Sequence, residues 1–307
     1  MMAATPRHVL SVGDLTAATL AALLERSMAL KRAPRTTQLA QHTLALIFEK
    51  PSLRTRVSFE VAMQELGGNC LVLRQDEIQM GQRESVEDIA AYLSRNVTVA
   101  ALRVFAHSTL TRFAAAASIP VVNALSDWEH PCQALADVLT VRAHCGRLAG
   151  VRLAYVGDGN NVCHSLLLAG ALGGMHMRVA CPAGYAPQAD VVEQARARGA
   201  AQGATIEIGH DPVAAVRGAD AVYTDVWASM GQEQEAAERQ RHFMPFQVNE
   251  PLMAHAPDAI VLHCLPAHRG EEITDAVIDS PRAVVFDQAE NRRHAQKAVL
   301  LYVLGML

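Results

Sequence analysis

The sequence predicts an α/β protein of two domains, each built on a parallel β-sheet flanked by helices. Three observations lead to this fold class. The 307 residues exceed the usual size of one domain. Short apolar runs rich in Val, Ile and Leu alternate with helical segments along the whole chain, as in βαβ units. Half of the residues are hydrophobic and 19% are charged, which allows well-buried cores.

The first half contains four apolar runs that we interpret as strands, at residues 43–48, 71–73, 99–105 and 121–124. A helix follows the first strand, because Phe59, Ala62, Met63 and Leu66 recur at helical spacing before a Gly-Gly pair. A second helix is predicted over 132–144 and stops at Gly146. We therefore place the domain boundary near residue 148, so that residues 1–148 form the first domain.

The second half repeats this rhythm over residues 149–290, which we expect to form the second domain. Its predicted strands lie at 152–156, 177–181, 205–208, 221–224, 260–263 and 284–287. A last helix is predicted from residue 291 to about 305, and we expect segment 291–307 to pack back onto the first domain.

Composition and charge exclude several classes of partner. Lys plus Arg total 27 and Asp plus Glu total 31, for a net charge of -4 with no long basic run, so nucleic acid is not expected as a partner. No apolar stretch is long enough to span a bilayer, and the N-terminus lacks the apolar core of a signal peptide. We expect a cytoplasmic protein that does not contact membranes, with six scattered cysteines that are reduced and mostly buried.

Ligands of open parallel sheets bind beyond the carboxyl ends of the strands, so the polar residues after each strand are candidates for chemistry. After the first strand, Ser52, Arg54 and Thr55 stand at the start of a helix. Unpaired backbone N–H groups, the helix dipole, hydroxyl groups and a guanidinium all suit a phosphate. An ordinary N-cap with solvated arginines is the competing interpretation of these few residues.

Two further strand ends carry residues that can bind oxygen atoms. Arg103 lies in the apolar run 102–105, where a charge is costly unless it meets an anion or reaches solvent at the strand end. After the fourth strand, His130 can donate to a carbonyl oxygen and Gln133 to an amide-like group. A single histidine is more often structural, so this motif depends on its neighbours.

The turn Gly157-Asp158-Gly159-Asn160-Asn161 resembles part of a dinucleotide-binding fingerprint. The third glycine of that fingerprint is missing, and no acidic residue clearly ends the next strand, so a nucleotide-binding oxidoreductase is a weak alternative. Asn161 instead offers both a donor and an acceptor to a zwitterionic ligand.

The last two strand ends supply a carboxylate and a thiol. Asp225 opens the segment Asp-Val-Trp-Ala-Ser-Met-Gly at 225–231, and it can pair with an ammonium group. Cys264 lies in the segment His-Cys-Leu-Pro at 263–266, whose composition suggests a metal site. Neighbouring strand residues point to opposite faces, so we expect His263 and Cys264 not to share a metal.

Four motifs in this order resemble the transcarbamylase family over nearly the whole chain: Ser-Leu-Arg-Thr-Arg at 52–56, His-Pro-Cys-Gln at 130–133, and the segments at 225–231 and 263–266. The Ser-Met-Gly and His-Cys-Leu-Pro runs are similar to those of the ornithine branch. The resemblance implies a transcarbamylase-like fold whose first domain binds carbamoyl phosphate and whose second binds ornithine. It also implies transfer of the carbamoyl group to give citrulline and phosphate, in arginine biosynthesis or breakdown.

The resemblance further implies a role for each site residue. Those expected to bind carbamoyl phosphate are Ser52, Leu53, Arg54, Thr55, Gln79, Arg103, His130, Gln133, Cys264, Leu265 and Arg292. Of these, Arg54, Thr55, Arg103, His130, Cys264 and Arg292 are expected to be catalytic, and Asn161, Asp225, Ser229 and Met230 to bind ornithine. Gln79 is similar to a residue lent to a neighbouring subunit, which implies a homotrimer with shared active sites. No metal or organic cofactor is expected.

Leu53 departs from the commoner ornithine-branch pattern, which has threonine there. A leucine side chain cannot hydrogen-bond phosphate, although its backbone N–H can. Transcarbamylases for other amines also carry leucine at this position, so putrescine, N-acetylornithine and aspartate stay open as acceptors. A non-catalytic amino-acid-binding protein with this fold is a further alternative.

Overall fold

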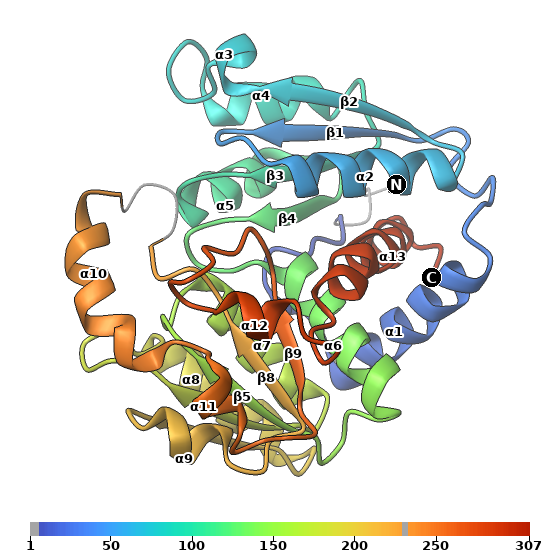
Figure 1. Cartoon of the computed structure of the whole chain (residues 1–307). Helices are drawn as coiled ribbons and strands as arrows, with labels where there is room; N and C mark the ends of the chain where they lie inside the picture. The colour runs from blue at the N-terminus through green and yellow to red at the C-terminus, as the bar shows by residue number, and fades with distance from the viewer. Residues whose placement is uncertain (1–5, 229–232) are drawn as a thin grey trace. The chain divides into compact units, whose positions relative to one another are not determined.

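The computed structural model describes residues 6–228 and 233–307, which divide into two compact units (Figure 1). The first comprises Met1–Ala136 and Glu290–Leu307, and the second Asp137–Ala289. Two helices, α6 (Pro131–Cys145) and α13 (Val285–Val303), each contribute residues to both units. The predicted boundary near residue 148 lies just after α6 and stays a prediction.

The first unit is built on a four-stranded parallel sheet in the order β2-β1-β3-β4. Its strands are β1 (Thr43–Phe48), β2 (Asn69–Arg74), β3 (Val99–Arg103) and β4 (Val121–Leu125). Besides its shares of α6 and α13, the unit contains α1 (Ala17–Arg32), α2 (Leu53–Glu65), α3 (Gln75–Ile78), α4 (Val86–Leu93) and α5 (His107–Ala116).

Helices α4 and α5 bury one face of this sheet. Ile47 of β1 and Leu102 of β3 belong to one hydrophobic cluster with Ile89 of α4 and Phe113 of α5, and all four are buried. The opposite face carries the intervening residues, such as Leu44 and Leu46, which are fully buried as well. Strands covered on both faces explain the continuous apolar runs in the sequence.

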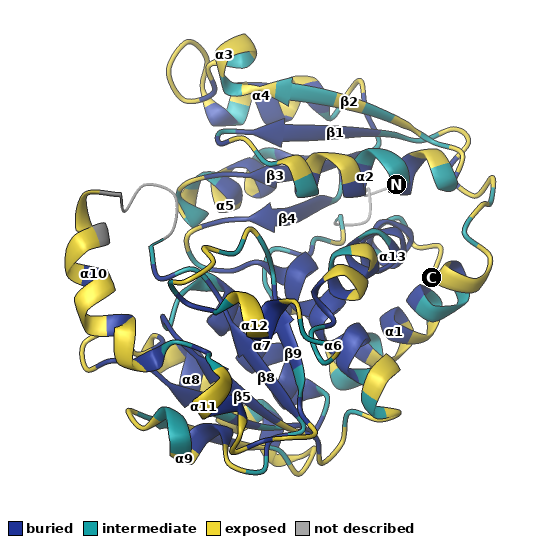
Figure 2. Cartoon of the chain, viewed as in Figure 1, coloured by how far each residue is buried: buried dark blue, intermediate teal, exposed yellow. Residues whose placement is uncertain are grey.

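The second unit is built on a five-stranded parallel sheet in the order β7-β6-β5-β8-β9. Its strands are β5 (Arg152–Val156), β6 (His176–Ala180), β7 (Thr205–Gly209), β8 (Ala221–Thr224) and β9 (Ile260–His263). Its helices are α7 (Asn161–Leu172), α8 (Ala189–Ala200), α9 (Pro212–Val216), α10 (Ala236–Phe243), α11 (Glu250–Met253) and α12 (Asp275–Ile278). Figure 2 shows β5 and β8 as buried and much of α10 as exposed.

The predicted fold class is confirmed, and nine of the ten predicted strands are present with ends that differ by two residues at most. The tenth, at 284–287, is wrong. Only Ala283 forms a bridge, with Val261 of β9, and α13 then begins at Val285, six residues before its predicted start. A short apolar run fits a strand and a buried first helical turn equally well, and its period does not separate them.

None of the described helices is both long and apolar enough to cross a membrane. All six cysteines are free thiols. Cys132, Cys163 and Cys181 are buried, and the other three are half-buried.

Candidate active site

The two sheets place the candidate residues at their topological switch points. In the first unit the chain leaves β1 to form β2 on one side and β3 on the other, so Ser52 and Arg103 lie where the strand order reverses. In the second unit β5 and β8 flank the corresponding point, and Asn161 and Asp225 follow them. Ligands of open α/β sheets bind at such points.

The residues predicted to bind phosphate lie at the N-terminus of α2. Ser52 is the N-cap, and its Oγ accepts from the backbone N–H of Thr55 at 3.2 Å. The next N–H groups of a first helical turn have no partner within the helix and point at whatever binds there. Arg54, half-buried on this turn, has no hydrogen-bond partner within residues 6–228 and 233–307.

Three donors converge on the hydroxyl oxygen of Thr55. Ser52 Oγ lies 3.1 Å from it, Arg103 Nη1 3.4 Å and Arg292 Nη2 3.1 Å. Arg103 and Arg292 are buried, and buried cations are stabilised by an anion among them.

Arg103 ends β3 at an irregularity of the sheet and is buried. The register between β3 and β4 shifts at this residue, because Leu102 pairs with Asn123 and Arg103 with Leu125. One extra residue of β4, Ala124, therefore lies opposite the end of β3. The charge in the apolar run therefore has a polar contact in Thr55, and it does not extend into solvent.

His130 and Gln133 lie at the start of α6 and are both buried. Burial, together with the charges of Arg292, Arg103 and Lys50, holds the pKa of His130 well below its usual value. The imidazole is therefore neutral at physiological pH and can donate one hydrogen bond to a carbonyl oxygen.

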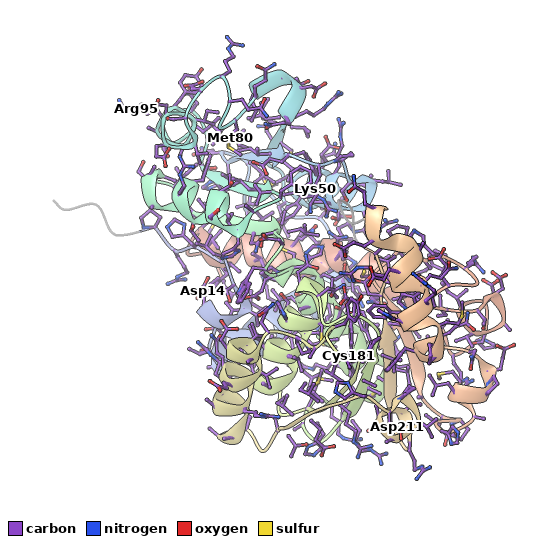
Figure 3. The ribbon with its side chains drawn as sticks, turned by 90° about the vertical axis from the view of Figure 1, so that its left-hand side faces the viewer. Asp14, Lys50, Met80, Arg95, Cys181 and Asp211 are labelled. Carbon is purple, nitrogen blue, oxygen red and sulfur yellow. The ribbon has the colours of Figure 1, made fainter. Side chains whose placement is uncertain are left out.

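Lys50 belongs to this cluster and was not among the predicted site residues. Labelled in Figure 3, it lies on the loop from β1 to α2, and its ammonium sits over the ring of Phe105, 4.9 Å from the centroid. Burial and the neighbouring Arg103 lower its pKa to about 8. The Glu-Lys pair directly after the first strand was the signal that could have identified it.

Two other predicted residues of this unit lie on its surface. The side chain of Leu53 is 74% exposed, so only its backbone faces the helix N-terminus. Gln79 is exposed at the C-cap of α3, in the left-handed conformation with φ 48°. Within this chain Gln79 is thus directed away from the core and remains accessible to another molecule.

In the second unit Asp225 and Cys264 come together after β8 and β9. The Cys264 thiol donates to Asp225 Oδ1 at 3.0 Å, and the Asn160 amide donates to Asp225 Oδ2 at 2.9 Å. Asp225 is buried, and Cys264 is half-buried. The predicted ornithine residues Ser229 and Met230 lie outside the described residues.

The loop after β9 is fixed by His263 and Glu272, a fully buried pair. His263 Nδ1 accepts from the backbone N–H of Leu265 at 2.9 Å, and its Nε2 lies 2.9 Å from Glu272 Oε1. Glu272 also accepts from the backbone N–H of His268 at 2.6 Å. These bonds hold Leu265, which has a positive φ of 58°, next to Cys264.

The side chains of His263 and Cys264, which we expected to point apart, lie close together. Ligand atoms of Asp225, His263 and Cys264 lie within 4.8 Å of one another, because β9 ends at His263 and the alternation of a strand stops there. Both ring nitrogens of His263 are nevertheless engaged in hydrogen bonds, so the imidazole is structural. The expectation that no metal is needed stays a prediction.

The Gly-Asp-Gly-Asn-Asn turn serves packing. A Cβ on Gly159 would lie 2.2 Å from the backbone nitrogen of Pro187, so neighbouring chain occupies the space that a pyrophosphate needs in a dinucleotide site. Asn160 caps α7, and Asn161 is its first residue. The turn therefore presents the amide of Asn160 to Asp225 at 2.9 Å, whereas sequence reasoning selected its neighbour Asn161.

Comparisons with known proteins identify two matching family regions. Residues 7–143 match "Aspartate/ornithine carbamoyltransferase, carbamoyl-P binding domain" and residues 149–303 match "Aspartate/ornithine carbamoyltransferase, Asp/Orn binding domain". A protein of Parafrankia sp. named ornithine carbamoyltransferase is 54% identical over 306 residues, covering 98% of this chain and 96% of the relative. An anabolic ornithine carbamoyltransferase of Pyrococcus furiosus is 51% identical over 304 residues, covering 97% and 96%. The structure of an ornithine carbamoyltransferase from that organism superimposes with a TM-score of 0.96 at 50% identity, covering 100% of both chains.

Proposed function

The chain belongs to the aspartate/ornithine carbamoyltransferase family, and we propose that it transfers the carbamoyl group of carbamoyl phosphate to the side-chain amine of L-ornithine. The products are L-citrulline and phosphate. The ornithine carbamoyltransferases that match at 51% and 54% identity over almost the full length support this choice of acceptor.

The observation that carries the proposal is the cationic cluster around Thr55. Lys50, Arg103 and Arg292 are buried beside the N-terminus of α2. This arrangement suits a doubly charged phosphate group, which accepts hydrogen bonds from helix N–H groups and guanidinium forks. Ser52, Leu53, Arg54 and Thr55 would hold the phosphate, the first and last of them through hydroxyl groups.

The carbamoyl end needs donors of a different kind. His130, neutral in this environment, and the buried amide of Gln133 are suited to the uncharged carbonyl and amide groups. Attack on the carbonyl carbon forms an oxyanion, which Thr55, Arg103 and His130 would stabilise. Losing one such donor typically costs roughly 3–4 kcal/mol of barrier.

The second unit supplies the residues for ornithine. The carboxylate of Asp225 suits an ammonium group, and Asn161, Ser229 and Met230 are proposed to bind the amino-acid end. Cys264 and Leu265 would lie at the reacting amine. An alkylammonium titrates near pH 10, so the site must bind or generate the neutral amine. The amine attacks the carbamoyl carbon to form the oxyanion, and phosphate then leaves with the electron pair of the bond from carbon to its oxygen and takes the proton that the nitrogen loses.

We further propose a homotrimer in which Gln79 completes the site of a neighbouring subunit. Its exposure on the loop after α3 supports this role, because a residue that served its own site would be turned inward. The anabolic name of the Pyrococcus furiosus relative favours synthesis of arginine as the physiological direction, and a cytoplasmic location remains a prediction.

The test is an acceptor panel. Purified protein is incubated with carbamoyl phosphate and, separately, ornithine, putrescine, N-acetylornithine or aspartate, and both carbamoylated product and released phosphate are measured. Citrulline formed from ornithine alone supports the proposal. Turnover with another amine would retain the carbamoyl-transfer chemistry and overturn the acceptor, and no turnover with any amine would indicate a binding protein.

A further inference from the structure

A continuous chain of hydrogen bonds runs from the core of the second unit to the thiol of Cys264. The Tyr155 hydroxyl donates to Asn160 Oδ1 at 3.3 Å, Asn160 Nδ2 donates to Asp225 Oδ2 at 2.9 Å, and Cys264 Sγ donates to Asp225 Oδ1 at 3.0 Å. Tyr155 itself is fully buried and stacks on Tyr223, with ring centroids 5.6 Å apart. The chain therefore begins at a rigid, packed side chain.

The orientation of the Asn160 amide is fixed by its role as the cap of α7. Its Oδ1 accepts from the backbone N–H groups of Val162 at 3.0 Å and Cys163 at 3.1 Å. Backbone N–H groups only donate, so the atom that faces them must be the oxygen, and the amide nitrogen must face Asp225. Neither flip nor rotation of the amide is possible without losing the cap.

This geometry leaves Asp225 ready to bind a cation. A carboxylate offers about four lone-pair sites, and Asn160 and Cys264 occupy one on each oxygen. Each oxygen thus keeps a site for an ammonium group, while the plane of the carboxylate is held at both ends. The nearby Asp158 is not free to compete for a cation, because Arg239 donates to its Oδ2 at 2.9 Å.

We propose that Asn160 is a positioning residue that aims the Asp225 carboxylate at the α-ammonium group of ornithine. This inference rests on the proposed function, since it assigns Asp225 the ammonium group of the acceptor. Helix capping and carboxylate positioning are then two tasks of one side chain: the oxygen anchors the amide, and the nitrogen holds Asp225.

The two tasks can be separated by substitution. Asn160→Asp keeps an oxygen for the cap of α7 but replaces the donor to Asp225 with a second carboxyl oxygen. Asn160→Ser keeps a hydroxyl cap and removes the donor without adding charge. Asn249 is a matched control, because it caps α11 through a 3.0 Å bond from Leu252 N and Asn249→Asp makes the same chemical change elsewhere.

Steady-state kinetics with each substrate varied in turn is the measurement. Both Asn160 variants should raise KM for ornithine roughly 10- to 100-fold, as expected for loss of a hydrogen bond to a charged group, with KM for carbamoyl phosphate within about twofold of wild type. Two carboxyl groups at hydrogen-bond distance do not readily ionise together. The rise in KM for ornithine caused by Asn160→Asp should therefore change with pH across the neutral range, whereas the rise caused by Asn160→Ser should not. Asn249→Asp should match wild type in both KM values.

An equal rise in both KM values, or a fall in turnover that tracks a loss of helical signal, would assign Asn160 a structural role only and overturn the inference. Wild-type protein assayed in parallel separates this failure from failure of the proposed function. If wild type uses putrescine, the acceptor is wrong, but the ratio of KM values for putrescine between Asn160→Ser and wild type still tests the positioning of Asp225, because putrescine keeps a second, charged amino group. Use of aspartate or N-acetylornithine, which keep none, would overturn the inference together with the acceptor.

Discussion

The buried charge of Lys50 is expected to lower the stability of the folded protein and to strengthen the binding of phosphate. The substitution Lys50→Met tests both effects. The pKa of Lys50 is lowered from 10.5 to about 8, chiefly by burial and by Arg103, which corresponds to a cost of about 3 kcal/mol for keeping the charge at neutral pH. The contact with the exposed ring of Phe105 returns about 0.5–1 kcal/mol. Methionine fills a similar volume without charge, so the variant should be about 2 kcal/mol more stable than wild type at pH 7.

The gain should depend on pH with a definite sign. Between pH 8 and pH 10.5 the unfolded chain holds a proton on Lys50 that the folded chain has lost, so wild-type stability rises with pH over this window. The variant has no such group. Its advantage should be complete below pH 8, shrink above it and vanish near pH 10.5.

Thermal unfolding of both proteins at pH 7 and pH 9.5, in the absence of substrates, measures this difference. A gain of about 2 kcal/mol raises the melting temperature of a unit of this size by about 4–8 °C, and most of that rise should be gone at pH 9.5. In the same pair of proteins, KM for carbamoyl phosphate should be higher in the variant, because an anion loses one of its cations. A variant that is less stable at pH 7, or that binds carbamoyl phosphate as wild type does, would refute the reasoning.

Three further substitutions have defined outcomes. Arg103→Ala should lower turnover by about 10²- to 10³-fold with unchanged circular dichroism, and near-normal turnover would remove it from the catalytic cluster. Glu272→Ala should leave the buried His263 without its carboxylate and cost about 1–3 kcal/mol of stability in denaturant titration, a value that a loss below 0.5 kcal/mol would contradict. Lys297→Met should remove the donor to Glu65, Leu30 O and Pro34 O and cost about 1–3 kcal/mol in the same assay, with Arg293 still 3.4 Å from the Glu65 carboxylate; an unchanged midpoint would show that these bonds contribute no stability.

The sequence predicted element types better than it predicted where the elements lie in space. Apolar runs of four to six residues became strands wherever helices cover both faces, as at β1 and β8. The strand prediction at 284–287 was wrong because the same apolar residues can also form the first turn of a buried helix. The order of the strands could not be predicted from the sequence. It is the order β2-β1-β3-β4 that places Ser52 and Arg103 at a single switch point. Arg103 was nevertheless identified, because a charge inside an apolar strand signals a cost that something must offset.

Lys50 and Asn160 escaped prediction for a shared physical reason. Lys50 stands two residues before Ser52 and Asn160 directly before Asn161, both of which were selected. Each also has an ordinary structural interpretation, Lys50 as a charged loop residue after a strand and Asn160 as an N-cap. Their role in the site becomes visible only from the contacts that the ends of their side chains make in the fold. The ammonium of Lys50 lies in a buried cationic cluster, and the amide of Asn160 reaches Asp225, 65 positions along the chain. Residues so far apart in the sequence leave no local pattern from which their contact could be predicted.

The candidate residues of the two units differ in charge, and each set suits one of the proposed substrates. In the first unit Lys50, Arg103 and Arg292 suit a dianion, whereas in the second unit Asp225 suits a cation, and burial raises the pKa of Asp158 to about 6 despite its bond to Arg239. A dianion is therefore disfavoured where ornithine is proposed to bind, and an ammonium is disfavoured where phosphate is. Because of this separation, KM for carbamoyl phosphate should depend on residues of the first unit, and KM for ornithine on residues of the second. A substitution in the cationic cluster should act on carbamoyl phosphate, and one at Asn160 or Asp225 should act on ornithine.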